Sequence, residues 1–131
     1  MDAAQAIGDL TEISPQVKRV VALAADGSVL GSNLANEAEV TRLAEGAVRL
    51  VEAAEAMRPD IQQLEAATVD GSVFVVRDGG RTIAATTTPE PTVGLVFYDL
   101  KTCLRSIDDP PAPAPKAKAT SKKAGATDAA A

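Results

Sequence analysis

The chain has 131 residues, of which 46% are hydrophobic and only 2% aromatic, and it contains one cysteine and no histidine. This length is typical of a single domain, whose core must be built from Val, Leu, Ile and Ala. The lack of histidine excludes His-based acid/base, nucleophilic and metal chemistry. The single Cys103 excludes an intramolecular disulfide and fits a reducing compartment.

The net charge of −5 is unevenly divided along the chain. Residues 1–109 carry nine Lys/Arg against seventeen Asp/Glu, a net −8, whereas residues 110–131 carry four lysines against Asp128, a net +3. An acidic body argues against specific nucleic-acid binding. There is no Lys or Arg before Lys18, as a signal peptide would need, and no apolar run of about 18–20 residues. We therefore expect a cytoplasmic protein with no membrane partner.

The first third of the chain predicts a short helix and a β-hairpin. Residues 2–13 place apolar side chains at helical spacing, and residues 17–25 and 29–33 are two apolar β-like runs. Asp26-Gly27 between these runs favours a tight type I′ turn. Gly31 makes the second strand a poor central strand and a plausible edge.

Residues 36–57 predict a long helix, which opens with Asn36 and Glu39 at capping-box spacing. A three-strand meander follows, and its turns contain Asp70-Gly71 and Asp78-Gly79-Gly80. Its strands are residues 64–69, 72–77 and 81–87.

Residues 93–98 taken alone resemble another strand. Over the longer stretch to Ile107, however, apolar residues recur at spacings of three and four positions. This spacing predicts a helix over residues 92–107.

The strands are apolar at consecutive positions, which predicts helices on both faces of the sheet. The expected fold is α/β, an α/β/α sandwich on a five-stranded antiparallel sheet, with the long central helix on one face and both terminal helices on the other. Residues 1–109 form this domain. Residues 110–131 are rich in Pro, Ala and Lys, and their composition predicts a disordered tail that is dispensable for folding.

The apolar arc of the long helix spans about 200°, whereas packing on one layer needs little more than about 100°. The simplest explanation of this wide arc needs no partner: Ala is a good helix former, and the chain is rich in Ala. We favour a homodimer interface made from this helix and the second strand, because Gly46 and Ala53 would let a second helix approach closely. The predicted interface residues are Val29, Gly31, Leu43, Gly46, Ala47, Leu50, Ala53, Ala54 and Met57.

No residue pattern predicts a catalytic, cofactor or metal site, and we expect that the protein is not an enzyme. Cys103 lies at a core-facing helical position, which favours a buried small hydrophobe over a nucleophile. Gly79-Gly80-Arg81 lacks the pattern of a phosphate-binding loop. Five arginines could reach a partner's phosphate, although surface arginines usually only maintain solubility: Arg42, Arg49, Arg58, Arg77 and Arg81.

The order helix, hairpin, long helix, three-strand meander and helix resembles the Roadblock family. The likeness covers about residues 3–107 and is carried by residues 20–30, the Ala/Leu-rich helix through Met57, the meander over residues 73–84 and the helix that begins at Val93. In having this final helix, the chain resembles the bacterial, MglB-like branch, because the eukaryotic dynein light chains tend to lack it. The Lys/Ala/Pro tail has no counterpart in that resemblance.

The resemblance implies a roadblock/profilin-like fold and a homodimer whose sheets join edge to edge. Bacterial members commonly bind small Ras-like GTPases, either as regulators of GTP hydrolysis or as scaffolds, so it also implies a dimeric, non-catalytic partner of a small GTPase. Two alternatives remain at this point: a structural dimerisation adaptor without a GTPase partner, and a profilin-like sensor domain that binds a small ligand. An aliphatic core without convergent polar residues argues against the sensor.

Overall fold

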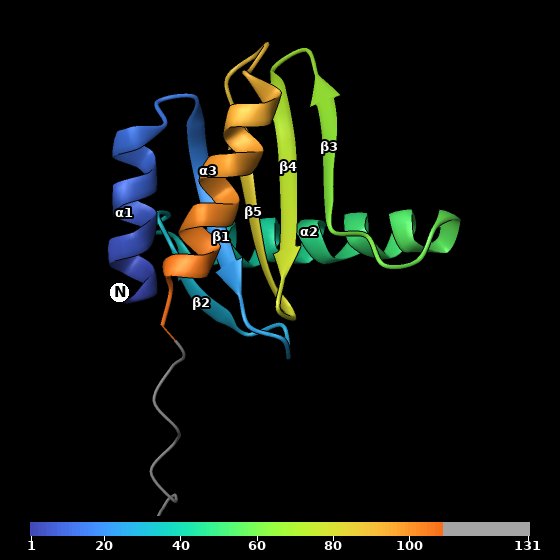
Figure 1. The fold of residues 1–131 in the computed structure, drawn as a ribbon, viewed down its shortest axis with the longest axis horizontal. Coiled ribbons are helices and arrows are strands. Elements are labelled where there is room, and N and C mark those ends of the chain that lie inside the picture. The colour runs from blue at the N-terminus through green and yellow to red at the C-terminus, as the bar shows by residue number, and fades with distance from the viewer. Residues whose placement is uncertain (109–131) are drawn as a thin grey trace, which may run out of the picture.

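The computed structural model describes residues 1–108, which form three helices and five strands. The predicted tail of residues 110–131 lies outside the described residues. Figure 1 shows one sheet with α1 and α3 on one face and α2 on the other. The elements in chain order are α1 (Ala3–Ile13), β1 (Val17–Leu23), β2 (Val29–Ser32), α2 (Glu37–Met57), β3 (Gln63–Thr68), β4 (Gly71–Asp78), β5 (Arg81–Thr87) and α3 (Val93–Ser106).

The strands pair antiparallel in the order β2-β1-β5-β4-β3. This confirms the predicted fold class and the position of β2 at an edge; β3 forms the other edge. The apolar run at the start of α3 is helical, as the longer window predicted. The predicted elements differ from the observed ones by at most two residues at either end, and the strand over residues 81–87 is matched without change.

Each face of the sheet has its own core cluster. On one face, α1 and α3 pack on alternate residues of the strands, including Val20, Phe74 and Ile83, and Phe97 of α3 meets Phe74 edge-to-face with ring centroids 4.9 Å apart. The cluster under α2 is smaller and comprises Val21, Leu23, Ala44, Ala47, Val51, Val75 and Ala84. The sheet is therefore apolar on both sides, which explains its uninterrupted apolar strands.

A helix lies on each face of the sheet, as expected, but the coverage by α2 is incomplete. Figure 1 shows α2 crossing behind the strands rather than running along them. Strand register aligns Val21, Ala84, Val75 and Leu64 in one cross-strand row, of which the first three are buried. The next row on the same face, here called the open row, is less covered: Arg19 is exposed, and Thr86, Val73 and Ala66 are half-buried.

The turns at Asp26-Gly27 and Asp70-Gly71 differ from the type I′ geometry that an Asp-Gly pair favours. At the first hairpin Gly27 has φ +89° while Asp26 has negative φ, and Gly27 N–H donates to Ala24 O at 2.9 Å, as in a three-residue loop ending in a left-handed glycine. Gly71 is not a central residue of its turn, because it pairs with Thr68 across the hairpin and leaves Val69 and Asp70 at the central positions. Only Gly79-Gly80 has positive φ at both central positions, as a type I′ turn requires.

Side chains cap the starts of α1 and α2, the second at Asn36 as predicted. Asp2 Oδ1 accepts a hydrogen bond from the Gln5 N–H at 2.8 Å, and Asn36 Oδ1 accepts one from the Glu39 N–H at 3.1 Å. Within residues 1–108 the structure contains no helix that is both long enough and apolar enough to cross a membrane.

Candidate interface on the long helix

Helix α2 is long, but few of its residues are buried against the sheet. Of its 21 residues only Ala44, Ala47 and Val51 are buried, with exposed fractions of 8%, 3% and 8%. Their small side chains let α2 lie close to β1 and β5. Much of the apolar surface of α2 therefore remains outside the core of this chain.

One side of α2, here called the apolar flank, gathers most of the predicted interface residues. Helical spacing places Leu43, Gly46, Leu50, Ala53 and Met57 along it. Leu43 and Leu50 touch the edge of the core cluster under α2, whereas Met57 is 88% exposed. A Cβ added to Gly46 would meet no atom within 4 Å outside its own stretch of helix, so the flank is open there. Ala54, half-buried, lies between this flank and the sheet.

The opposite side of α2 faces the hairpin turns. Val48 and Glu52 line a cavity of about 340 Å³ together with Gly27 and Gly80, which belong to the β1–β2 and β4–β5 turns. Because these turns lie at one end of the sheet, the apolar flank faces the other end, where the open row is. The apolar flank and the open row meet at an angle and together form a step in the surface. The helix makes one side of this step, and the incompletely covered strands make the other.

The free edge of β3 borders this step. Figure 1 shows the C-terminal end of α2 extending past β3 before the chain returns to it. The alternate residues Gln63, Glu65 and Ala67 are exposed, as are Thr68 and the following turn. Arg77 of β4 fixes this region by donating from Nη1 to Glu55 Oε2 at 2.7 Å and to Ile61 O at 3.3 Å.

Three predicted interface residues lie elsewhere. Ala47 is buried beneath α2 against the sheet. Val29, 47% exposed, and Gly31 belong to β2, at the opposite edge from β3. A Cβ on Gly31 would lie 2.8 Å from Ala3 Cβ, so this glycine permits the close approach of α1, on the other face of the sheet from α2. Sequence reasoning missed the edge of β3, although its polar alternation and its place directly after α2 are visible signals.

The five arginines named in the sequence analysis separate into two groups. Arg77 is held by Glu55, and Arg81 donates from Nη1 to Ile107 O at 3.0 Å and from Nη2 to Leu104 O at 3.1 Å, which satisfies carbonyls at the end of α3. The other three, Arg42, Arg49 and Arg58, are exposed on α2 or at its C-cap. Arg77 and Arg81 therefore have structural roles.

Cys103 is packed in the core, as predicted. It is only 6% exposed, and burial, with a smaller contribution from the negative charge of Asp9, raises the pKa of its thiol to about 11. A thiol with this pKa is protonated at neutral pH and has little nucleophilic character.

No protein-family model and no curated protein sequence matches the chain. Solved structures do resemble it. A Roadblock/LC7 domain from Streptomyces avermitilis has 18% identity and a TM-score of 0.67, covering 81% of this chain and 94% of that one. A second Roadblock/LC7 structure from this organism has 23% identity and a TM-score of 0.62, covering 79% and 95%. Myxococcus xanthus MglB has 14% identity and a TM-score of 0.60, covering 79% and 89%.

These likenesses define the class of fold: the chain has the Roadblock/LC7 fold. MglB from Thermus thermophilus resembles it as well, with 13% identity, a TM-score of 0.58, and coverage of 78% and 82%. The resemblance seen in the sequence, to Roadblock domains and to their MglB-like branch, is thus confirmed at the level of the fold.

Proposed function

We propose that this protein is a non-catalytic homodimer that binds a small Ras-like GTPase in the cytoplasm, as a regulator or as a scaffold. The observation that carries the proposal is the apolar flank of α2, left uncovered beside the open row and the free edge of β3. Large exposed apolar surfaces of this kind mark protein interaction sites. The MglB-like resemblance supports the GTPase as partner, because bacterial proteins of that branch commonly bind such switches.

A second copy of the chain fits this step. Two α2 helices would pack flank to flank, with Gly46 and Ala53 giving the close approach, and each helix would also cover part of the partner's open row. The edges of β3 would pair, which satisfies their free backbone groups. This proposal keeps Leu43, Gly46, Leu50, Ala53, Ala54 and Met57 as interface residues. It assigns Ala47 a supporting role and replaces the β2 residues Val29 and Gly31 with the edge of β3.

An effect on GTP hydrolysis would come from repositioning the groups of the GTPase or from an arginine supplied in trans. The candidates for such an arginine are Arg42, Arg49 and Arg58, since Arg77 and Arg81 are engaged within the fold. A trans arginine is worth about 10³–10⁵ in rate, so its replacement by Ala would be obvious in a turnover assay. If none of the three matters but hydrolysis is still stimulated, the protein acts by repositioning groups of the GTPase; if hydrolysis is not stimulated at all, the protein acts as a scaffold.

The dimer is tested by light scattering after size exclusion. We expect a wild-type dimer at micromolar concentration and a folded monomer for Leu50→Arg, because the new charge would be buried between the helices. The matched control is Val48→Arg, on the opposite side of the same helix and 42% exposed, which is expected to stay dimeric. A monomeric wild type would refute the dimer.

The partner is tested with a small GTPase encoded beside the gene, loaded with either GDP or a GTP analogue, in a pull-down paired with a turnover assay. Binding by the wild type and by Val48→Arg is expected. GTP hydrolysis by the isolated protein would contradict the non-catalytic assignment. A dimer that binds the GTPase in neither nucleotide state would be the dimerisation adaptor instead.

A further inference from the structure

A second surface lies on the other face of the sheet, between α1 and α3. These antiparallel helices enclose a cleft of about 170 Å³ whose walls are mostly apolar, with Ala6, Leu10 and Ile13 on α1 and Cys103 on α3. An apolar cavity of about 150 Å³ is large enough to hold a benzene molecule. The cleft therefore has room for one aliphatic or aromatic side chain.

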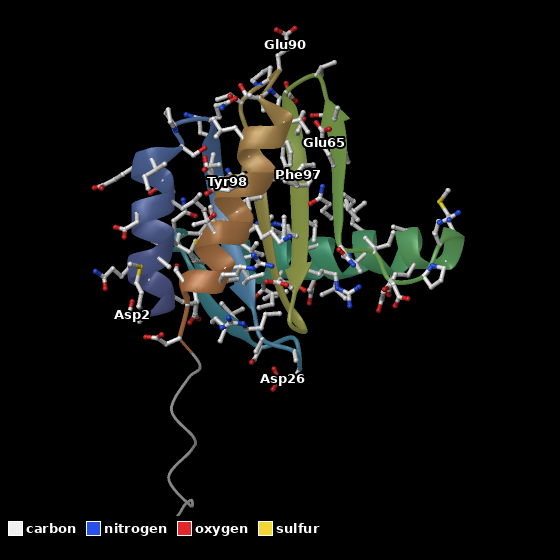
Figure 2. The ribbon with its side chains drawn as sticks, viewed as in Figure 1. Asp2, Asp26, Glu65, Glu90, Phe97 and Tyr98 are labelled. Atoms are coloured by element: carbon white, nitrogen blue, oxygen red, sulfur yellow. The ribbon has the colours of Figure 1, made fainter. Side chains whose placement is uncertain are left out.

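Large apolar side chains continue from the mouth of the cleft onto the surface. Ile13 is 72% exposed on α1, and Leu95 and Tyr98 of α3 are 48% and 68% exposed. Tyr98 stands on the outer side of α3, with α1 beside that helix (Figure 2). Leu95 precedes Asp99 by one helical turn, and Tyr98 precedes Thr102 by one turn, so both adjoin residues that line the cleft. Neighbouring exposed apolar residues of this size are typical of a docking surface.

The rim of the cleft is acidic. Asp9 and Asp99 line it from opposite sides, and α1 carries Asp2 at its N-cap and Glu12 in its last turn. No Lys or Arg occurs in α1, and among residues 1–108 neither Asp9 nor Asp99 forms an ion pair. The negative charge of Asp9 also contributes to the raised pKa of Cys103.

The nearest cations of α3 face away from this cleft. Lys101 and Arg105 line a different, polar cavity of about 540 Å³ near the β4–β5 turn, and Arg105 donates to Asp78 Oδ2 at 2.7 Å. The two sides of α3 thus differ in charge, with Asp99 on the side toward α1. The N-terminal ammonium of Met1, which also lines the cleft, is neutralised by its ion pair with Asp108.

We propose that the groove between α1 and α3 binds a basic, amphipathic peptide segment of a partner protein. One apolar side chain of that segment enters the cleft above Cys103, others pack on Ile13 and Tyr98, and its Lys or Arg side chains pair with Asp9 and Asp99. The groove lies on the opposite face of the sheet from α2, so this segment binds independently of the dimer contact through the apolar flank.

The chain's own residues 110–131 are a poorer occupant. They supply four lysines but no apolar side chain larger than proline, and the cleft accepts a leucine or an aromatic ring. A second copy of residues 1–108 is also a poorer occupant of the groove, because this part of the chain is itself acidic and would be repelled by Asp9 and Asp99. A partner segment that combines positive charge with a large apolar side chain satisfies both features of the groove.

The test uses a fluorescein-labelled 14-residue peptide of Leu and Lys at amphipathic helical spacing, with a Leu/Glu peptide for comparison. Binding to the full chain is followed by fluorescence anisotropy and by NMR shift changes of the ¹⁵N-labelled protein. We expect the Leu/Lys peptide alone to bind, with shift changes confined to α1 and α3.

Matched variants separate a specific groove from general attraction to an acidic protein. Asp9→Asn combined with Asp99→Asn should weaken binding about tenfold, whereas Glu45→Gln with Glu52→Gln on α2 removes the same charge and should change it less than about twofold. Ile13→Ser should weaken binding, and Val69→Ser, at a residue 92% exposed and remote from the groove, should not.

The proposal would be overturned by no binding of the Leu/Lys peptide, by equal weakening from the two charge pairs, or by shift changes centred on α2 or β3. Binding seen only after removal of residues 110–131 would mean that the chain's own segment occupies the groove, and would also overturn it.

Discussion

Arg77 on β4 and Glu55 near the end of α2 form an ion pair with a 2.7 Å hydrogen bond from Nη1 to Oε2. The same nitrogen donates to Ile61 O at 3.3 Å, in the loop that leads to β3. The last turns of α2 extend past the sheet, beyond the three buried residues of the helix. This pair therefore fixes the angle at which α2 leaves the sheet, and with it the position of the apolar flank.

Arg77→Met is expected to lower the free energy of unfolding by about 1 kcal/mol, because both partners are about one-third exposed and such pairs are worth little more. It should also speed amide exchange in residues 52–58 more than in the rest of α2. Urea denaturation and hydrogen-exchange mass spectrometry measure the two effects. Unchanged exchange at the end of α2 would show that the pair does not anchor the helix.

Gly71→Ala is expected to destabilise the protein by at least about 2 kcal/mol. Gly71 has φ +142°, and a Cβ placed there would lie 2.0 Å from the carbonyl oxygen of Thr87 on β5. The matched control is Gly8→Ala in α1, where nothing lies within 4 Å and alanine should stabilise the helix by up to about 1 kcal/mol. Thermal unfolding of both variants checks this, and similar melting temperatures would contradict the packing at Gly71.

The elements of the fold could be predicted from the sequence because apolar spacing differs sharply between helices and strands. Turn geometry could not, because an Asp-Gly pair permits positive φ without fixing which residues form the turn. Gly71 illustrates this: it lies in the ladder opposite Thr68 with φ +142°, and the atom that a side chain there would meet, the carbonyl oxygen of Thr87, is distant in sequence.

The interface proposed here could be derived from the sequence only in part. Helical spacing reveals the wide apolar arc of α2, and hence Leu43 and Leu50, but it does not give the direction in which α2 crosses the strands. That direction decides that Ala47 is buried beneath the helix and that β3, rather than β2, borders the uncovered flank. Likewise Gly31 suggests an edge strand, and only the packed fold shows that its space is taken by Ala3.

Stability is expected to fall as the pH rises above about 9, with Cys103 as one cause. The thiol has a pKa of about 11 in the fold against 9.0 ordinarily, so between these values the unfolded chain loses a proton that the folded chain retains. The unfolded state is therefore favoured progressively, by up to about 2–3 kcal/mol at the upper end of this window. Urea unfolding at pH 8 and pH 10.5 measures the fall, and Cys103→Ala should show less of it. An equal fall in both proteins would assign the effect to other groups.

Removing residues 110–131 is expected to leave the melting temperature within about 2 °C of the full chain. Both core clusters are built from residues between Ala3 and Ile107, and the removed segment contains no Leu, Ile, Val or aromatic residue that could add to them. The shortened chain keeps Asp108, whose N–H donates to Met1 O at 2.8 Å and joins the end of the domain to the start of α1. Its net charge becomes −8, so later elution from an anion-exchange column verifies the removal. A fall of many degrees in the melting temperature would mean that residues 110–131 contribute to the folded domain.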